Sequence, residues 1–516
     1  MSLAIAHARA QIGLRAPLVI IETHLTPGLP AFGMVGLAET AVRESKERVR
    51  SAILNAGFEF PHRRITINLA PADLPKEGTR FDLAIALSVL AASGQVSPAS
   101  LERYEYAAEL ALTGELRPVR GVLPAALAAR SDQRALICAR ENCREATLCE
   151  GLEVYAPRNL REVCTHLDNS RPLQAVPLAP PQLLSGNALI PDLADIQGQF
   201  AARRGIEIAA AGGHNLLMVG PPGTGKTMLA MRLPGLLPTL SSQAALEVAS
   251  IRSIASLPWT PELWRTPPFR APHHTASAVA IIGGGAIPRP GEVSLAHHGV
   301  LFFDELPEFD RRVLEVLREP LESFRVTISR AAKQAEFPAD FQFIAAMNPC
   351  PCGYAGDTSG RCFCSVEKIA RYLSRISGPL LDRIDIQLEV GRESDWLRKP
   401  EIVVAEASEI VRNRVLAARE IQLARQSCLN SRLGPTDLAA VTILDGPSKH
   451  LLEQAFTHFN LSPRTYHRLL RLARTIADLT GQVHVTRHEV AEALHLRRLE
   501  LRQNALSKQR AGLYPG

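Results

Sequence analysis

The sequence contains no long apolar run. None approaches the roughly 20 consecutive apolar residues of a membrane-spanning helix, so we expect no membrane partner. The chain opens with MSLAIAHARAQIGL, which has neither a long apolar segment nor a small-residue cleavage site. This start predicts a protein without a signal peptide, located in the cytoplasm.

Cysteine is scarce outside one stretch of the chain. The reducing conditions of the cytoplasm argue against disulfides and leave metal binding or free thiols as roles for cysteine. Five of the nine cysteines lack the spacing of metal ligands, and we expect them to be buried or inert thiols: Cys138, Cys143, Cys149, Cys164 and Cys428.

The other four cysteines fall in NPCPCGYAGDTSGRCFC and form two Cys-x-Cys pairs: Cys350 and Cys352, then Cys362 and Cys364. A polar, Gly-containing loop separates the pairs, so that they can close around a tetrahedral ion. We predict one structural Zn²⁺ held by four thiolates, with four reduced thiols as the alternative. A catalytic zinc is not expected, because four thiolates leave no open position for water.

Neither sign of charge dominates the composition. The chain has 58 Lys and Arg against 52 Asp and Glu, a net charge of +6. This excess mildly favours a polyanionic partner, although an ordinary solvated surface gives the same value. Hydrophobic residues make up 46% and charged residues 21% of the 516 positions, which is typical of a soluble globular protein with two to four domains.

Changes in composition divide the chain into four segments. Residues 1–166 mix short apolar runs with helical patterns, which predicts an α/β or α+β domain. Residues 167–190 are rich in Pro and Ser and lack a period, which predicts a linker. Residues 191–392 alternate apolar strands with helices, which predicts an α/β domain with a largely parallel sheet. Residues 393–516 are almost entirely helical in pattern.

Two helices of the last segment carry clear end signals. In LSPRTYHRLLRLARTIADLTG, Ser462 is a predicted N-cap, Pro463 occupies the first turn and Gly481 ends the helix. In TRHEVAEALHLRRLELRQ, Thr486 and Glu489 form a predicted capping box.

The strongest chemical signal is NLLMVGPPGTGKT, a Walker A motif that follows a predicted strand ending at Val219. Its glycines let backbone N–H groups surround phosphate oxygens at the start of a helix. Lys226 is expected to reach the β- and γ-phosphates of ATP, and Thr227 to bind Mg²⁺. The predicted cradle consists of Gly220, Pro221, Pro222, Gly223, Thr224 and Gly225.

Two further strands end in polar residues that fit the same site. GVLFFDEL ends in Asp304, a predicted Mg²⁺ ligand, and Glu305, which would align the attacking water. FQFIAAMN ends in Asn348, whose amide would face the γ-phosphate and hold the same water. The alternative is that Asp304 and Glu305 belong to an ordinary solvated acidic loop after a core strand.

With FRAPHHTAS, AAMNPCPCGYAG, SRISGPLLDRID and RTYHRLLRLARTIADL, these motifs closely match one family. The chain resembles the magnesium-chelatase-like AAA+ ATPases and, within them, the ComM or YifB family, over nearly its whole length. The resemblance implies a hexameric ring around DNA that acts as an ATP-driven helicase. Such a helicase promotes branch migration between incoming single-stranded DNA and the chromosome during natural transformation, so single-stranded and branched DNA are the implied partners.

The resemblance also implies roles for two arginines. Arg383 in LLDRID matches the arginine finger that completes the site of the neighbouring subunit, and Arg464 in SPRTYHR matches the sensor 2 arginine of the helical lid. A fixed guanidinium stabilises the charge that develops on the γ-phosphate. From the residues alone, either arginine also fits a surface ion pair.

The N-terminal segment resembles the fold of the Lon protease domain. The position of the Lon nucleophile, a serine, falls at Arg80, and the position of its lysine falls at Leu123. Without a nucleophile or a base, the domain is expected to be proteolytically inactive and to serve ring assembly or DNA contact.

Two segments are candidate pore elements. IIGGGAIPRPGEVS, with Arg289, lies between the Walker motifs, and FRVTISRAAKQAEFPADF alternates like a hairpin with Arg330 and Lys333 near its tip. The resemblance implies that both project into the pore of the ring, where cations would grip a phosphate backbone. An ordinary solvated hairpin is the alternative. No aromatic residue interleaves these cations, which favours sequence-independent backbone binding over base stacking.

Two other functions stay open at this point. One is the ATPase motor subunit of a metal chelatase, which would couple hydrolysis to insertion of Mg²⁺ into a porphyrin. The other is an ATP-driven remodeller of proteins. Two histidine doublets, His273 with His274 and His297 with His298, are expected to be hydrogen-bonded structural residues, with metal binding as the alternative.

Overall fold

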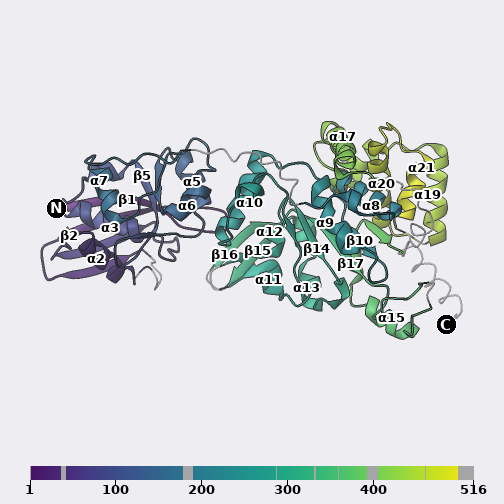
Figure 1. The fold of residues 1–516 in the computed structure, drawn as a ribbon, viewed down its shortest axis with the longest axis horizontal. Coiled ribbons are helices and arrows are strands. Elements are labelled where there is room, and N and C mark those ends of the chain that lie inside the picture. Colours follow the sequence, from purple (N-terminus) through teal and green to yellow (C-terminus); the bar gives the residue numbers. More distant parts are fainter. Residues whose placement is uncertain are drawn as a thin grey trace.

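The computed structural model describes residues 2–36, 42, 44–177, 190–285, 288–330, 333–357, 360–391, 405–459 and 461–497. Most of the predicted linker 167–190, the junction 392–404 and the end of the predicted helical segment lie outside these ranges. Three parts follow one another along the long axis of the molecule (Figure 1). We call them the N-terminal part (2–177), the central part (190–391) and the helical part (405–497).

The N-terminal part is built on a seven-stranded mixed sheet in the order β3-β4-β2-β1-β5-β8-β9. β1 pairs antiparallel with β2 and parallel with β5. Its strands are β1 Ser2–Arg9, β2 Leu18–Thr26, β3 Ala31–Val35, β4 Arg64–Ala70, β5 Tyr104–Ala107, β8 Ala135–Cys138 and β9 Val154–Tyr155. Its main helices are α2 Ser45–Asn55, α3 Asp82–Ala92, α5 Val122–Ser131, α6 Arg140–Ala146 and α7 Leu160–Leu167.

The helix α3 forms the centre of the N-terminal core. Its sequence, DLAIALSVLAA, is apolar on all sides, and every residue of the helix is buried. It packs against both β1 and β2. The strands show the complementary pattern, since buried and partly exposed residues alternate along β2.

The central part contains the five-stranded sheet β11-β14-β17-β10-β18, and each of its pairings is parallel, as the sequence predicted. The strands are β10 Leu216–Val219, β11 Phe269–Arg270, β14 Val300–Phe303, β17 Gln342–Met347 and β18 Ile386–Glu389. The surrounding helices are α8 Phe200–Gly212, α9 Lys226–Leu236, α10 Ser242–Ile254, α11 Ala278–Ile282, α12 Glu292–Leu295, α13 Arg311–Val316, α14 Pro320–Ser323, α15 Val366–Leu373 and α16 Gly378–Leu381.

Both faces of this sheet are covered, which explains why its strands are continuously apolar. Leu216 and Met218 of β10 face the core formed with α8 and α9, whereas Leu217 and Val219 face the opposite core. Because all the strands are parallel, their carboxyl ends lie along one edge of the sheet. That edge is where the predicted nucleotide-binding residues follow the strands.

The two candidate pore segments each form an antiparallel hairpin in the central part. The first pairs β12 Gly283–Gly284 with β13 Arg289–Pro290. The second pairs β15 Arg325–Arg330 with β16 Lys333–Pro338, with Arg330 opposite Lys333. The hairpin expected from the alternation in FRVTISRAAKQAEFPADF is therefore confirmed.

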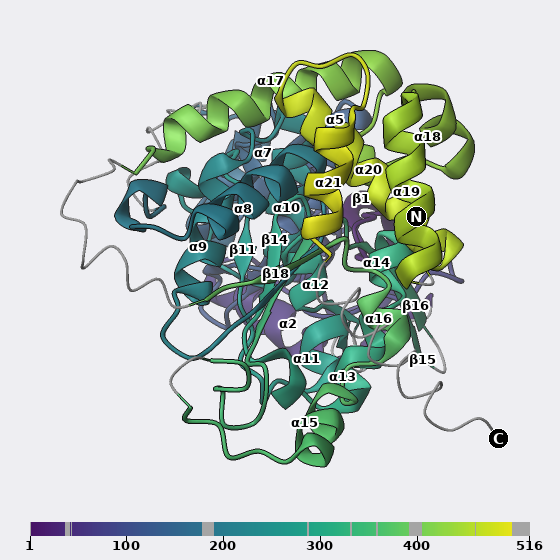
Figure 2. The same cartoon turned by 90° about the vertical axis from the view of Figure 1, so that its right-hand side faces the viewer.

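The helical part consists of α17 Ser408–Gln426, α18 Pro435–Val441, α19 Gly446–Phe459, α20 Pro463–Leu479 and α21 Arg487–His495. The predicted caps are confirmed, because the Ser462 side chain accepts from Thr465 N–H and Thr486 forms a capping box with Glu489. Helices α17 and α20 pack on α8 and share its apolar core, so the helical part is fixed to the central part (Figure 2).

The N-terminal part joins the central part through α5 and α10. Val122, Leu123 and Ala126 of α5 form one apolar cluster with Ala249 of α10. The backbone N–H of Gly121 also donates to the Ser253 carbonyl at 3.2 Å. The two parts therefore meet through packed side chains, and not only through the chain that connects them.

Candidate functional site

The Walker A loop connects β10 to α9 at the carboxyl edge of the central sheet. Gly223 and Gly225 have φ angles of +78° and +84°, a left-handed conformation that side chains rarely adopt. In a Walker A loop such turns let successive backbone N–H groups face a phosphate, and the N-terminus of the following helix adds positive potential. The loop therefore has the local geometry of a phosphate cradle.

Lys226, the first residue of α9, folds back over this loop. Its ammonium donates to the carbonyls of Gly220 at 2.7 Å and Pro221 at 2.8 Å, and to Asn348 Oδ1 at 3.4 Å. Burial lowers the pKa of Lys226, and the nearby carboxylates of Asp304 and Glu305 oppose that shift. The structure thus brings the predicted cation of the site and the predicted sensor amide within hydrogen-bond range of each other.

Thr227 and Asp304 meet at the same edge of the sheet. The Thr227 hydroxyl donates to Asp304 Oδ2 at 2.6 Å, although the two residues are far apart in sequence. A hydroxyl and a carboxylate beside a phosphate cradle are hard oxygen ligands of the kind that Mg²⁺ prefers. These two residues therefore fit the role of holding Mg²⁺ with ATP.

Glu305 occupies a strained position directly after Asp304. Its φ angle is +54°, and its backbone N–H donates to Asp304 Oδ1 at 2.9 Å. Non-glycine residues seldom adopt this conformation, which is found preferentially at functional sites. The turn leaves the Glu305 carboxylate half-exposed at the mouth of the site, where it is accessible to a water molecule.

His274 is a site residue whose role the sequence did not reveal. Its Nδ1 lies 3.7 Å from Glu305 Oε2, and its ring is tilted by 34° against that of His273, with centroids 4.1 Å apart. The FRAPHHTAS motif pointed to the histidine doublet but not to this neighbour, because the contact joins two loops that leave adjacent strands.

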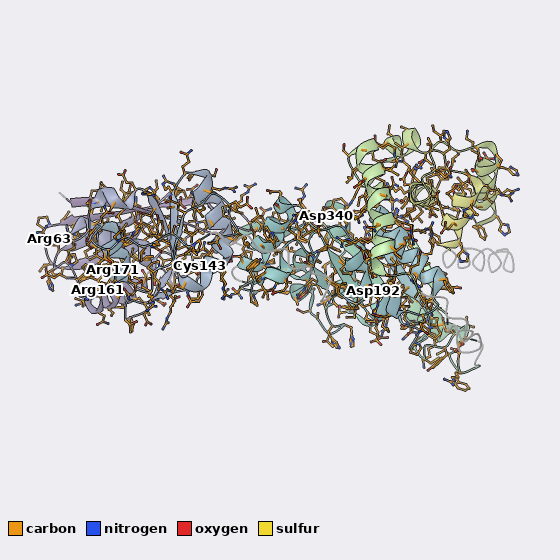
Figure 3. All side chains as sticks on the ribbon, turned by 45° about the horizontal axis from the view of Figure 1, so that its top comes forward. Arg63, Cys143, Arg161, Arg171, Asp192 and Asp340 are labelled. Carbon is orange, nitrogen blue, oxygen red and sulfur yellow. The ribbon has the colours of Figure 1, made fainter. Side chains whose placement is uncertain are left out.

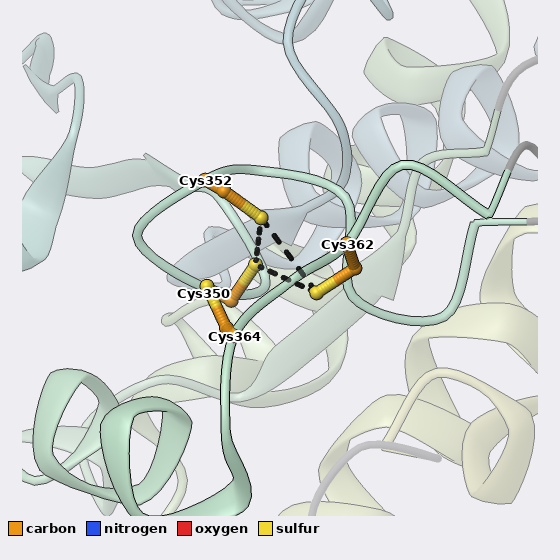
Figure 4. A group of neighbouring side chains, drawn as sticks. All are labelled: Cys350, Cys352, Cys362 and Cys364. Atoms are coloured by element: carbon orange, nitrogen blue, oxygen red, sulfur yellow. Dashed lines mark hydrogen bonds between the residues drawn. The ribbon is translucent and has the colours of Figure 1, made fainter.

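The four clustered cysteines converge in space, as Figure 4 shows. Cys350 Sγ lies 3.3 Å from Cys352 Sγ and 3.8 Å from Cys362 Sγ, and the last two are 3.6 Å apart. All four sulfur atoms, including that of Cys364, fall within 4.8 Å of one another. A tetrahedral site with Zn–S bonds of about 2.3 Å requires sulfurs about 3.8 Å apart. The cluster therefore has the size of a four-thiolate metal site.

The cysteine loop also contacts the Walker A loop. Gly353 packs so closely that a Cβ atom there would lie 2.7 Å from Pro222 Cδ and 3.8 Å from Asn348 Cγ. Gly353 has a φ angle of +87° and donates its N–H to the Cys350 carbonyl at 2.9 Å. The cysteine loop thus supports both the phosphate cradle and Asn348.

Arg383 and Arg464 lie at the opposite edge of the sheet from Lys226. The Arg383 carbonyl accepts from Asn215, just before β10, and Arg464 Nη1 lies 3.7 Å from Asp382 Oδ2. Asn215 precedes β10 and the cradle follows it, so the Arg383 backbone and the cradle of the same chain lie at opposite ends of a strand of about 13 Å. Within one chain, the structure brings the two arginines near each other but not near the predicted ATP site.

The predicted DNA-contacting residues lie on the two hairpins. Arg289 is exposed on β13. The backbones of Arg330 and Lys333 close the second hairpin beside its tip, while their side chains fall outside the part of the chain that the structure describes.

The second histidine doublet forms a structural hydrogen-bond network. His297 Nδ1 accepts from the backbone N–H of Asp340, a residue labelled in Figure 3, at 3.0 Å. The proton of the neutral His297 ring is therefore on Nε2, which lies 3.2 Å from Glu247 Oε2. His298 Nε2 reaches the same oxygen at 2.9 Å. Because Nε2 of His297 carries a proton, it has no lone pair for a metal. The geometry favours the structural role that we expected.

One of the two predicted protease-like positions, Arg80, faces a cavity of about 700 Å³ between the N-terminal part and the two hairpins. Arg80 lines it, is buried, and donates to the carbonyls of Arg9 at 3.2 Å and Arg120. Burial lowers the pKa of Arg80 to about 10. Leu123 is fully buried in the contact with α10. Neither side chain offers a nucleophile or a base.

Comparison with protein families covers most of the chain. Residues 192–396 match the family described as magnesium chelatase, subunit ChlI, and residues 405–497 match its C-terminal domain. Residues 21–142 match the family described as subunit ChlI of Mg-chelatase. Within the described ranges, no helix combines the length and apolar character that crossing a bilayer requires.

Several curated proteins are similar over nearly their full length. Competence protein ComM of Haemophilus influenzae is 49% identical over 503 residues, which cover 96% of this chain and 98% of that protein. Protein YifB of Salmonella typhimurium is 48% identical over 500 residues, covering 97% and 98%. A relative from Mycobacterium tuberculosis is 41% identical over 522 residues, covering 98% and 100%.

Proposed function

Since the chain belongs to the ComM and YifB family of magnesium-chelatase-like proteins, we propose that it is an ATP-driven DNA motor. It would hydrolyse ATP in a homo-hexameric ring and move DNA strands during recombination of incoming DNA. The observation that carries the ATPase assignment is the convergence of Lys226, Thr227, Asp304 and Asn348 on one edge of a parallel sheet.

Each residue of this edge has a distinct task in the proposed hydrolysis. The N–H groups of the loop and the Lys226 ammonium bind the phosphates, while Thr227 and Asp304 hold Mg²⁺, which neutralises the charge on the phosphate oxygens. Glu305 orients and polarises a water in line with the γ-phosphate, and Asn348 fixes that water from the neighbouring strand. His274, close to Glu305, helps to hold the carboxylate in place.

The separation of the arginines from the cradle supports a ring. The Arg383 backbone lies at the amino end of β10, whereas Lys226 follows its carboxyl end, and Arg464 lies beside Asp382 next to Arg383, which supports a role of both arginines at an ATP bound by another copy. A head-to-tail contact that closes on itself produces a ring in which every site is completed by its neighbour. We therefore assign both arginines to the neighbouring subunit's γ-phosphate.

The four cysteines are proposed to hold one Zn²⁺. Metal analysis of protein purified without chelator should find about one zinc per chain, and replacement of Cys350 and Cys352 by Ser should remove it. Replacement of Cys428, which lies apart from the cluster, should leave the zinc content unchanged. Metal-free wild-type protein would rule out the site.

Two cationic hairpins are the proposed DNA contacts. DNA binding is tested by the salt dependence of the affinity for single-stranded DNA. Replacing Arg330 and Lys333 by Ala should lower the log–log slope by roughly 0.7 for each phosphate that the variant no longer neutralises. Replacing Arg325, which pairs with Glu336 at the base of the hairpin, is the matched control and should change the slope less. Equal slopes for both variants would place the DNA site elsewhere.

The competing function is that of a metal-chelatase motor, which the names of the matching families favour. The N-terminal part does not separate the two functions, because residues 21–142 also match a chelatase subunit family. The deciding experiment measures ATPase activity with and without single-stranded DNA, and branch migration on synthetic three- and four-way junctions. Stimulation of the ATPase by single-stranded DNA, together with branch migration, supports the DNA motor. An ATPase that does not respond to DNA and that supports insertion of metal into a porphyrin overturns the DNA-motor proposal.

A further inference from the structure

Arg383 is held inside its own chain. Its guanidinium forms an ion pair with Glu322 and donates to the Pro379 carbonyl, and the side chain is only 15% exposed. Its Nε is buried and has no hydrogen-bond partner among the described residues. In this position the guanidinium is directed toward its own subunit, so reaching a phosphate on a neighbour requires the pair with Glu322 to break.

Glu322 is located at the root of the second hairpin. It belongs to α14, which ends at Ser323, and β15 begins at Arg325. Phe324 connects the two with a φ angle of +58°, a conformation that bulky residues rarely adopt. The backbone N–H of Ala339 donates to the Phe324 carbonyl at 2.8 Å and closes the base of the hairpin. A single strained residue therefore connects the helix that carries Glu322 to the hairpin.

The helical part also contacts the base of the second hairpin, through Arg432. The guanidinium carbon of Arg432 lies 3.4 Å from the centre of the Phe324 ring, and Arg432 also pairs with Asp340, just beyond β16. Both ends of the hairpin thus contact one arginine of the helical part. The hairpin, Arg383 and the helical part meet at the amino edge of the sheet.

From this arrangement, we propose that Glu322 is a positioning residue that restrains Arg383 and releases it when DNA moves the second hairpin. The proposal rests on the proposed DNA-motor function and adds its regulation: an ATP bound by the neighbouring subunit is hydrolysed slowly until DNA is engaged. The signal passes from the strands β15 and β16 through Phe324 to Glu322, and from there to the guanidinium. No covalent change is involved, only the exchange of one ion pair for another.

The test compares two carboxylates of the same segment. Glu322→Gln keeps the shape of the side chain and removes its charge. An ion pair with one exposed partner is worth up to about 1 kcal/mol, so ATPase activity without DNA should rise by roughly two- to fivefold. The ratio of activity with DNA to activity without it should fall by the same factor. Glu319→Gln is the matched control, because Glu319 is an exposed carboxylate one helical turn before Glu322. Its ATPase activity without DNA and its ratio of activity with DNA to activity without it should equal those of the wild type.

A second variant shows whether the effect passes through Arg383. The double variant Glu322→Gln with Arg383→Ala should have no more ATPase activity than Arg383→Ala alone. A gain that persists in the double variant, or an unchanged activity ratio in Glu322→Gln, overturns the proposal. A wild-type ATPase that ignores DNA, together with an Arg383-dependent gain in Glu322→Gln, would support the restraint while refuting the DNA-motor function.

Discussion

Single side chains of the proposed nucleotide site are expected to control different steps. Lys226 contacts the Walker A loop, whereas Glu305 follows Asp304, the proposed Mg²⁺ ligand, and is half-exposed. Removing a phosphate-binding cation weakens binding of ATP itself. Removing the carboxylate that polarises water affects only the chemical step.

We therefore predict that Lys226→Ala loses ATP binding, while Glu305→Gln binds ATP normally and hydrolyses it at least about 100-fold more slowly. Binding of a fluorescent ATP analogue and steady-state phosphate release measure the two effects separately. Asp310→Asn, in the exposed N-cap of α13, is a control that should preserve both. Wild-type turnover by Glu305→Gln would show that another residue activates the water.

His297 gives the stability of the central part a pH dependence. Burial lowers its pKa from 6.5 to about 4, with His298 adding to the shift and Glu247 and Asp340 opposing it. The folded pKa is below the unfolded one, so the unfolded state takes up the proton first as the pH falls. The stability contributed by His297 is complete above about pH 7 and is lost progressively toward pH 4, by an amount on the order of 3 kcal/mol.

The prediction is that the midpoint of urea unfolding falls between pH 7 and pH 4.5, and that His297→Asn flattens this dependence. The Asn carbonyl oxygen can accept the Asp340 N–H that Nδ1 accepts in the wild type, without titrating in this range. His298→Asn is the matched control and should retain most of the dependence, because burial is the largest cause of the low pKa of His297 and His298 a smaller one. Residue 298 has a φ angle of +59°, which Asn tolerates. An unaltered slope in His297→Asn would assign the pH dependence to other groups.

Among the structural elements, the cysteine loop and the Walker A loop pack against each other. Gly353 touches Pro222 and lies beside Asn348, whereas a Cβ atom on Gly356, in the same loop with a φ angle of +79°, would have no neighbour within 4 Å. The two glycines therefore have similar conformations but different surroundings. Substituting each in turn separates backbone strain from pressure on the nucleotide site.

Gly353→Ala and Gly356→Ala should both cost about 1 kcal/mol of local backbone strain. Only Gly353→Ala pushes a methyl group against the Walker A loop, so only it should raise KM for ATP, by roughly threefold or more. Steady-state ATPase kinetics of both variants give the comparison. Equal KM values for the two variants would show that the contact with Pro222 does not position the cradle.

For the whole molecule, the location of Arg383 predicts complementation between defective chains. Arg383→Ala and Lys226→Ala should each be inactive as pure rings, because one lacks the finger and the other the cradle. In mixed rings, a Lys226→Ala chain supplies its intact Arg383 to the intact cradle of an Arg383→Ala neighbour. Up to about a quarter of the sites in an equimolar random mixture combine both intact elements.

ATPase activity as a function of mixing ratio measures this effect and should pass through a maximum near equal amounts. A mixture of Lys226→Ala with Glu305→Gln is the control, since both changes disable the cradle side and no site regains all its parts. Mixed rings that form but show no activity would contradict a role of Arg383 in the neighbouring site.

The sequence by itself determined the local structure and the nucleotide-binding edge. The apolar runs defined β10, β14 and β17, and the residues after them reached one site because parallel strands place their carboxyl ends together. The caps at Ser462 and Thr486 were readable because capping depends on residues within one helical turn. The resemblance supplied the roles of Arg383 and Arg464, which no local pattern contains.

Only the tertiary structure decided which distant residues touch. The approach of Gly353 to Pro222, of His274 to Glu305 and of Glu322 to Arg383 joins loops whose separation in sequence carries no information about distance. Each contact depends on how helices and strands pack, which is set by the shapes of many side chains at once. For the same reason the resemblance named the arginines, and the fold alone showed that Arg383 pairs with Glu322 and that Arg464 lies beside Asp382 of its own chain.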